Sequence, residues 1–175
     1  MALEQLEEFL ASTEKRAFRL ARFAVANDAD ALDIVQDAMM KLVEKYSDKP
    51  TDQWAPLFYR ILQNRITDFH RSKKQKWSFW ASANDDEFTD VPEQEDINHP
   101  QAWYSAEQIN MALITEIEKL PHQQQQCFLL RGWQGLSVKE TAKAMGLTEG
   151  SIKTHYSRAL TKLSLILEQQ GALER

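Results

Sequence analysis

The stretch GLSVKETAKAMGLTEGSIKTHYSRALTKLSL, residues 135–165, decides how the C-terminal part of this chain folds. Ser137 and Glu140 have the spacing of a capping box, in which each side chain satisfies a free backbone N–H group of the other residue at a helix start. Gly146 suits the left-handed backbone position that ends a helix, and Thr148 is a good cap for a following helix. The stretch therefore predicts a short helix, a tight turn and a longer helix.

This order is typical of a helix-turn-helix, with its first helix expected over 138–145 and its second from 149 to about 168. Ala142 is small enough to let the two helices cross closely. Side chains in the N-terminal half of the second helix enter the major groove of DNA, where Arg reads guanine and Lys, Ser and Thr hold phosphates. A solvated amphipathic helix is the alternative interpretation, but the ordered capping signals and the basic tip favour DNA. The predicted DNA contacts are Ser151, Lys153, Thr154, His155, Ser157 and Arg158.

Charge is distributed unevenly along the 175 residues, although the net charge of −5 by itself disfavours a nucleic-acid partner. Residues 60–76 carry a net charge of +5, residues 77–118 carry −10, and residues 119–175 carry +4. Two basic segments thus flank a wholly acidic one. Because the local field rather than the net charge decides where a polyanion binds, the distribution permits two separate DNA-binding segments.

Apolar residues recur at helical spacing through most of the chain, and no strand pattern is visible. The remaining helices are expected over 3–26, 31–46, 54–74, 107–119 and 121–133. The run Gln123–Gln126 is expected to be a polar helix face. Residues 79–100 are rich in Asp, Glu, Asn, Ser and Pro without a steady period, which is typical of a linker. The chain is therefore predicted to be all-α, with two small helical domains, 1–76 and 107–175, joined by an acidic flexible linker, 77–106.

Several classes of function find no support in the sequence. Cys127 is the only cysteine, which excludes an internal disulfide, and its apolar setting indicates a buried core residue rather than a reactive thiol. The four histidines have no metal-ligand spacing, so we expect no metal and no other cofactor. A Ser-His-acid constellation and a Gly-rich phosphate loop are also missing, which argues against an enzyme. Without an apolar run near the ~18 residues of a membrane span, or a secretory signal, the protein is expected in the cytoplasm, with no membrane insertion.

Three segments resemble bacterial sigma factors. DALDIVQD, residues 30–37, resembles the segment DAEDLVQE of that family, and LFYRILQNRITDFHR, residues 57–71, resembles its WLyrIArNrliDhlR helix. Leu120-Pro121, Phe128 to Arg131, Gly135 to Ser137 and Arg158 to Leu160 are similar to the family's second DNA-binding segment. The order of these segments, with a short acidic linker and no intervening domain, is similar to the extracytoplasmic-function (ECF) class.

The resemblance implies three binding surfaces. The clamp-helix coiled coil of core RNA polymerase would bind a polar stripe in the helix over 31–46, where Leu32 departs from the family's usual Glu; a solvated face is the alternative. The −10 promoter element would meet the helix over 54–74, with a flipped base received near 47–53 and Trp54 closing that loop. The helix-turn-helix would read the −35 element. The polymerase stripe is Asp33, Gln36, Asp37 and Met40, and the −10 residues are Arg60, Asn64, Arg65, Arg71, Lys73 and Lys74.

Further partners and roles follow from the same resemblance. The polymerase flap is expected as a second contact of core polymerase, and an anti-sigma factor is the family's common regulator. Trp77 and Trp80, beside Lys76, either stack on bases or pack at a helix end. The acidic linker either imitates a nucleic-acid strand in a basic polymerase channel or covers the basic faces when polymerase is absent.

Two other classes of protein fit parts of the sequence. The segment Ser151–His155 also resembles the recognition helix of response-regulator activators, but those proteins carry a receiver domain with alternating strands and helices. A helical adaptor that binds only protein is the second alternative. The basic residues in both predicted domains argue against it.

Overall fold

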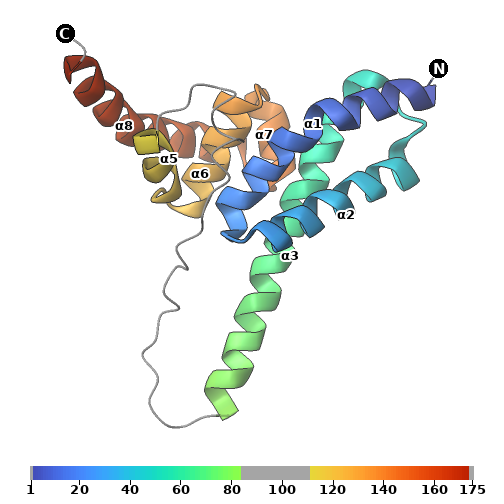
Figure 1. The fold of residues 1–175 in the computed structure, drawn as a ribbon, viewed down its shortest axis with the longest axis horizontal. Helices are drawn as coiled ribbons and strands as arrows, with labels where there is room; N and C mark the ends of the chain where they lie inside the picture. Colours follow the sequence, from blue (N-terminus) through green and yellow to red (C-terminus); the bar gives the residue numbers. More distant parts are fainter. Residues whose placement is uncertain (1, 84–110, 174–175) are drawn as a thin grey trace.

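The computed structural model describes residues 2–83 and 111–173, and every regular element in these ranges is a helix (Figure 1). The predicted all-α fold is confirmed. The N-terminal range holds α1 (Ala2–Val25), α2 (Asp28–Tyr46) and α3 (Thr51–Ala83). The C-terminal range holds α5 (Met111–Glu118), α6 (His122–Phe128), the π-helical turn η1 (Leu129–Trp133), α7 (Val138–Met145) and α8 (Glu149–Leu173).

Helices α1, α2 and α3 pack on one another around a core of large apolar side chains. Phe58 of α3 is fully buried, and its ring meets Phe9 of α1 edge-on at 6.3 Å between centroids. Trp54 is also buried, and its indole N–H donates to the backbone carbonyl of Tyr46 at 3.2 Å. This bond holds the end of α2 against the start of α3, so the Trp54 side chain has a fixed position behind the connecting loop.

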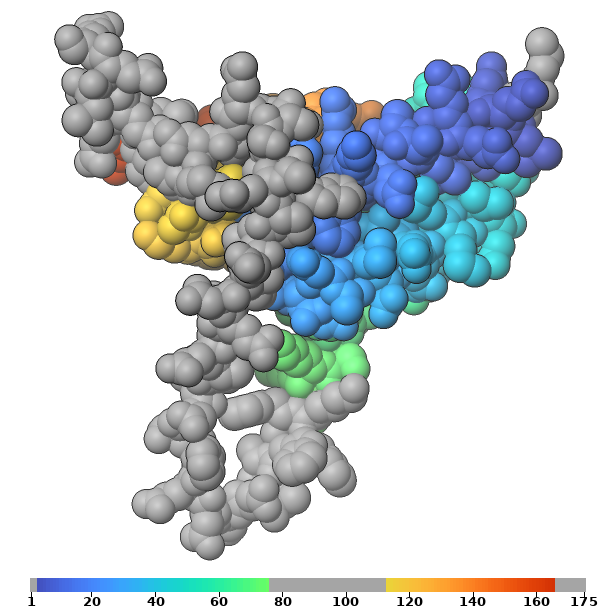
Figure 2. All heavy atoms as spheres, viewed as in Figure 1, coloured from blue at the N-terminus to red at the C-terminus, as the bar shows by residue number. Residues whose placement is uncertain are grey.

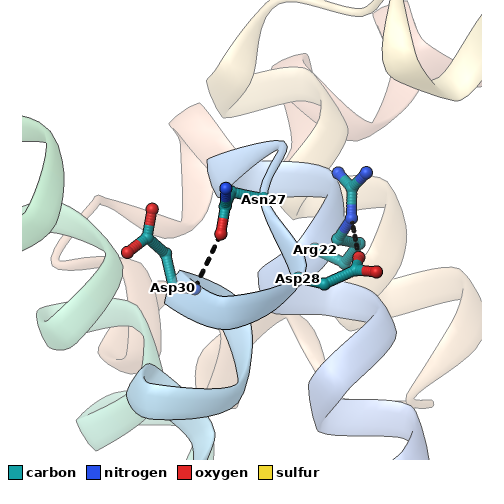
Figure 3. A network of polar contacts seen from close by, with 4 residues as sticks. All are labelled: Arg22, Asn27, Asp28 and Asp30. Atoms are coloured by element: carbon teal, nitrogen blue, oxygen red, sulfur yellow. Dashed lines mark hydrogen bonds and ion pairs between the residues drawn. The ribbon is translucent and has the colours of Figure 1, made fainter. Parts of the chain in front are cut away.

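The turn between α1 and α2 is built from polar contacts (Figure 3). Ala26 takes a left-handed φ of 55°, which ends α1. The side chain of Asn27 then accepts a hydrogen bond from the backbone N–H of Asp30 at 3.0 Å, and Arg22 pairs with Asp28 across the turn. Because Asn27 caps it, α2 begins at Asp28, earlier than the predicted start at residue 31.

The helix-turn-helix has the predicted bounds for its first helix and the predicted capping chemistry. Ser137 Oγ accepts from the backbone N–H of Glu140 at 3.1 Å, and Glu140 Oε2 accepts from that of Ser137 at 2.7 Å. Gly146 has a left-handed φ of 66°, and Thr148 Oγ1 accepts from the backbone N–H of Ser151 at 3.2 Å. The capping box and both turn residues are therefore confirmed.

Two helices differ from expectation. Helix α3 begins at Thr51, inside the loop predicted over 47–53, and runs past residue 76, the predicted end of the first domain, to Ala83. Residues 51–53 of that loop and residues 77–83 of the predicted flexible linker are therefore helical, and the C-terminal part of α3 projects away from the packed helices (Figure 1). The helix expected over 121–133 divides into α6 and η1, where the backbone N–H of Gln134 reaches the carbonyl of Leu129 at 2.9 Å. The wider π turn changes the direction of the following side chains, and Trp133 faces α1 with its ring 5.9 Å from that of Phe23.

The two halves of the chain share one hydrophobic core, which the sequence did not predict. Buried residues of α1–α3 and of α5–α8 form a continuous cluster, and α3 packs against α7 while α1 contacts α6. The space-filling view shows the described parts of α1, α2 and α3 as one closely packed surface (Figure 2). The expectation that Gln123–Gln126 form a polar outer face is wrong for three of the four residues. Gln124, Gln125 and Gln126 are buried, with exposed fractions of 9%, 4% and 0%. Gln126 meets Gln63 of α3, where the halves join, and Gln125 donates to the carbonyl of Ile117.

Candidate polymerase and nucleic-acid interfaces

The predicted polymerase stripe lies on the outer surface of α2. Asp33, Gln36 and Asp37 are exposed, and Met40 is 61% exposed although its side chain is apolar. All four residues line one shallow groove, which α3 completes with Arg65, Asp68 and Phe69. An exposed methionine among carboxylates gives this groove the mixed apolar and acidic character of a protein-binding surface.

One contact joins two sites that the sequence analysis assigned to different partners. Arg65 Nε lies 2.8 Å from Asp37 Oδ2 and forms an ion pair with it. The two side chains are 32% and 53% exposed, so solvent screens the pair and its contribution to stability is below about 1 kcal/mol. The predicted polymerase stripe and the predicted −10 residues therefore meet at the pair of Asp37 and Arg65.

The predicted −10 residues on α3 do not form a single track. Arg60, Asn64, Arg71 and Lys74 are exposed and recur at the spacing of one helix face. Arg65 turns instead toward α2. Lys73 also leaves this face, and its Nζ lies 5.9 Å from the ring centroid of Phe69. The side chains of Lys76, Trp77 and Trp80 fall outside the described residues, as do residues 84–110, which include most of the linker predicted over 77–106.

The predicted −35 residues occupy the outward part of α8, with unequal exposure. Lys153, Thr154, Ser157 and Arg158 are exposed, whereas Ser151 and His155 are half-buried. Thr154 Oγ1 donates to the carbonyl of Gly150 at 3.1 Å, and the Thr148 hydroxyl donates to Ser151 Oγ at 2.9 Å. The hydroxyls of Ser151 and Thr154 thus have partners within the helix. The side chains best placed for DNA are Lys153, Ser157 and Arg158.

Arg131 belongs to the same surface but was not among the predicted site residues. Its guanidinium lies 5.1 Å from the ring centroid of Tyr156, and Nη1 donates to the carbonyl of Leu136 at 2.9 Å. Together with Lys153 and Ser157, it lines a groove beside α8. The contact between Arg131 and Tyr156 depends on how two helices cross. The spacing of these two residues in the sequence therefore did not reveal that Arg131 belongs to this surface.

Cys127 is buried beneath the helix-turn-helix, as predicted. Its Sγ lies 3.5 Å from the carbonyl oxygen of Ile152, and burial raises the pKa of the thiol to about 11, against the opposing effect of Arg131. The thiol therefore stays protonated and unreactive at neutral pH. Among the described residues, no three His, Cys, Asp or Glu side chains gather where they could hold a metal ion. None of the helices in these ranges is both long and apolar enough to cross a membrane.

Two family models match separate parts of this chain. The family model "Sigma-70 region 2" matches residues 9–76, and "Sigma-70, region 4" matches residues 110–163. The ECF RNA polymerase sigma factor BldN of Streptomyces coelicolor is 30% identical over 155 residues, which are 86% of this chain and 55% of BldN. This chain thus spans about half the length of BldN. The RNA polymerase sigma-E factor of Streptomyces avermitilis is 27% identical over 98% of this chain and 92% of its own length.

A solved structure has the same fold. The sigma factor RpoE of Bartonella quintana, crystallised in complex with the anti-sigma factor NepR, superposes with a TM-score of 0.64 over 94% of this chain and 95% of its own, at 24% identity. The matched residues therefore include both helical halves of this chain. Both family models, the relatives and this fold lead to one assignment. The chain belongs to the sigma-70 family of RNA polymerase sigma factors, with region 2 in α1–α3 followed by region 4 in α5–α8, and within that family to the ECF class.

Proposed function

We propose that this protein is the promoter-specificity subunit of a bacterial RNA polymerase, acting in the cytoplasm and without catalysis of its own. It binds core polymerase through the groove on α2, reads the −10 element with α3 and reads the −35 element with α8. The observation that carries this proposal is that one folded chain exposes an acidic face on α2 and basic faces on α3 and α8.

The groove on α2 suits a basic helical partner. Asp33 and Asp37 supply negative charge, Gln36 supplies a hydrogen-bonding amide, and Met40 supplies apolar contact area. Leu32, next to the stripe, is 42% exposed where the family usually has Glu. It adds apolar area to the contact, so the affinity for the clamp helices depends more on buried surface and less on charge.

The DNA-reading faces are suited to different forms of DNA. The stripe of Arg60, Asn64, Arg71 and Lys74 follows one side of a long straight helix, which lets it track phosphates as the strands separate. The tip of α8 presents Lys153 and Arg158 as a compact pair that fits a major groove. The connection between α2 and α3, residues 47–50, lies in front of the buried Trp54 and receives a flipped base. Neither face needs to bind DNA tightly alone, because polymerase tethers both to the promoter.

An anti-sigma factor is a further partner that we propose for this chain. RpoE of Bartonella quintana, whose structure resembles this one with a TM-score of 0.64, was crystallised with the anti-sigma factor NepR. CnrH, with a TM-score of 0.54, was solved in complex with the cytosolic domain of CnrY. The exposed groove on α2 and the interface between the halves offer two surfaces on which such a regulator could act.

Run-off transcription tests this function directly. Purified protein is mixed with cognate core polymerase and genomic DNA fragments, and transcripts are mapped at their start sites. We expect initiation at a defined set of promoters that share −10 and −35 sequences. Core polymerase without the protein is the control. If no fragment gives more transcript with the protein than with core polymerase alone, the proposal is contradicted.

A further inference from the structure

The interface between region 2 and region 4 is a buried polar seam. Gln63 Nε2 donates to Gln126 Oε1 at 2.7 Å, and these side chains are 4% and 0% exposed. The Tyr59 hydroxyl donates to Gln134 Oε1 at 2.7 Å. Burial raises the pKa of Tyr59 well above its usual value despite Arg16 nearby, so this hydroxyl remains a donor at any physiological pH. The seam is therefore specific, since each buried polar group depends on its partner in the other half.

This closed arrangement is incompatible with reading both promoter elements at once. The names of the −10 and −35 elements place them about 25 base pairs apart, or ~85 Å along B-DNA at about 3.4 Å per base pair. In the structure, α3 and α7 are packed together, so the two DNA readers belong to bodies in direct contact (Figure 1). The seam must open before both elements can be engaged.

Two histidines face each other across one edge of this seam. His70 of α3 and His122, the first residue of α6, have ring centroids 5.1 Å apart and rings inclined at 74°. His70 is half-buried, with Nε2 shielded and unbonded, and His122 lies at the more exposed rim. Both line a cleft between region 2 and region 4. A positive charge on each ring would place two like charges side by side at the contact.

The surrounding groups disfavour that positive charge. Helix α3 contributes Arg71 and Lys74 to the cleft and Lys73 near His70, whereas α5 contributes one carboxylate, Glu118. On the α1 side the cleft is lined by Phe23 and by Ala24, whose carbonyl bonds His70; Arg22, next along α1, pairs with Asp28. His122 also lies in the first turn of α6, where the helix dipole opposes a cation.

The pKa shifts have the same sign as this geometry. Burial lowers the pKa of His70, with Lys73 acting in the same direction and the bond to Ala24 opposing it. Partial desolvation, where the otherwise exposed ring of His122 faces the cleft, also lowers the pKa of His122, and the neighbouring His70 lowers it further. The opened form, in which both rings are solvated, therefore binds protons more readily. As the pH falls through the ordinary histidine value of about 6.5, the closed form loses stability relative to the opened form.

We propose that His70 and His122 form a proton-sensitive latch: when both rings become cationic, the region 2–region 4 seam opens and frees the two DNA readers to separate. This regulation goes beyond the proposed sigma-factor function. It rests on that function for its biological meaning, but the opening of the seam can occur whether or not that function holds. The opening equilibrium constant increases by up to about tenfold per pH unit for each proton taken up.

Small-angle X-ray scattering of the full chain tests the latch. We expect the radius of gyration to increase between pH 8 and pH 5.5, with helical circular dichroism unchanged. The double variant H70F/H122F keeps two aromatic rings that cannot titrate, and it should stay compact at pH 5.5. The matched control H155Q removes a histidine on α8, outside the cleft, and should expand as the wild type does.

Three outcomes would overturn the latch. The radius of gyration of the wild type stays constant over this range, the double variant expands as much as the wild type, or H155Q abolishes the response. If H70F/H122F loses helical signal, the single variant H122Q at the exposed rim replaces it and should reduce the acid expansion. Because the readout is the size of the protein, failure of the latch is distinct from failure in run-off transcription.

Discussion

The outward faces of α2 and α8 and the seam between region 2 and region 4 use polar residues in opposite ways. On the outward faces, Asp33 and Lys153 are exposed to solvent. In the seam, Gln63 and Gln126 are buried; Gln63 donates to Gln126, which in turn donates to Gln125. An exposed charge costs little when its partner is absent, whereas a buried amide without a partner costs about 1–3 kcal/mol. The faces are therefore suited to reversible binding, and the seam to holding one arrangement.

The largest expected effect is on the acidic face. The double variant D33K/D37K reverses the charge of the α2 groove, and we expect it to abolish co-purification with core polymerase while circular dichroism shows an intact helical fold. The reason is that a partner helix of basic character would meet like charge at the centre of the contact. The control E7K/E14K makes the same change of charge at two exposed positions of α1. If D33K/D37K still co-purifies with core polymerase, the assignment of this face of α2 to polymerase binding is wrong.

The next effect breaks the seam. The variant Q126L leaves the buried amide of Gln63 without its partner, so the free energy of unfolding should fall by about 1–3 kcal/mol. The double variant Q63L/Q126L also removes the unpaired Gln63 amide and should recover the part of the loss that it causes, whereas the loss of the bond from Gln126 to Gln125 remains. Urea denaturation of the two variants and the wild type measures the difference. Equal losses in the single and double variants would show that the amide pair does not stabilise the seam.

This comparison also explains what the sequence could predict. Some features depend only on neighbours a few residues away, so the local sequence is enough to predict them. Examples are the capping box of Ser137 and Glu140 and the left-handed conformation of Gly146. The exposed stripe on α2 was predicted for the same reason, because residues three and four apart share a helix face.

The seam could not be predicted because its partners are far apart along the chain. Gln126 meets Gln63, and Gln134 meets Tyr59. A run of glutamines normally indicates solvent, and only a tertiary partner reverses that expectation. The splitting of the −10 residues has a similar origin. Arg65 pairs with Asp37 because α2 packs on α3, and the sequence pattern of either helix alone does not show this contact.

A sharper comparison concerns two cations on α8. Replacing Arg158 by Ala should change the preferred −35 sequence and cost about 1–3 kcal/mol at the affected base pair, because Arg reads a base edge. Replacing Lys153 by Ala should weaken all sequences evenly and make the salt dependence shallower by roughly one unit, because Lys neutralises a phosphate. DNA binding of the holoenzyme to a library of −35 variants at several salt concentrations separates the two. An equal loss on every sequence for both variants would contradict the assignment of Arg158.

The smallest expected effect lies where the acidic face meets the −10 surface. Replacing Asp37 by Asn removes the ion pair with Arg65, and the free energy of unfolding should change by less than about 1 kcal/mol, because both side chains are partly exposed. D33N is the matched control on the same stripe, since Arg65 pairs with Asp37. Urea denaturation at low and high salt gives the measurement, and high salt should remove the difference between the two variants. A loss several times larger, insensitive to salt, would mean that the pair is shielded from solvent and that Asp37 stabilises region 2 instead of waiting for a partner.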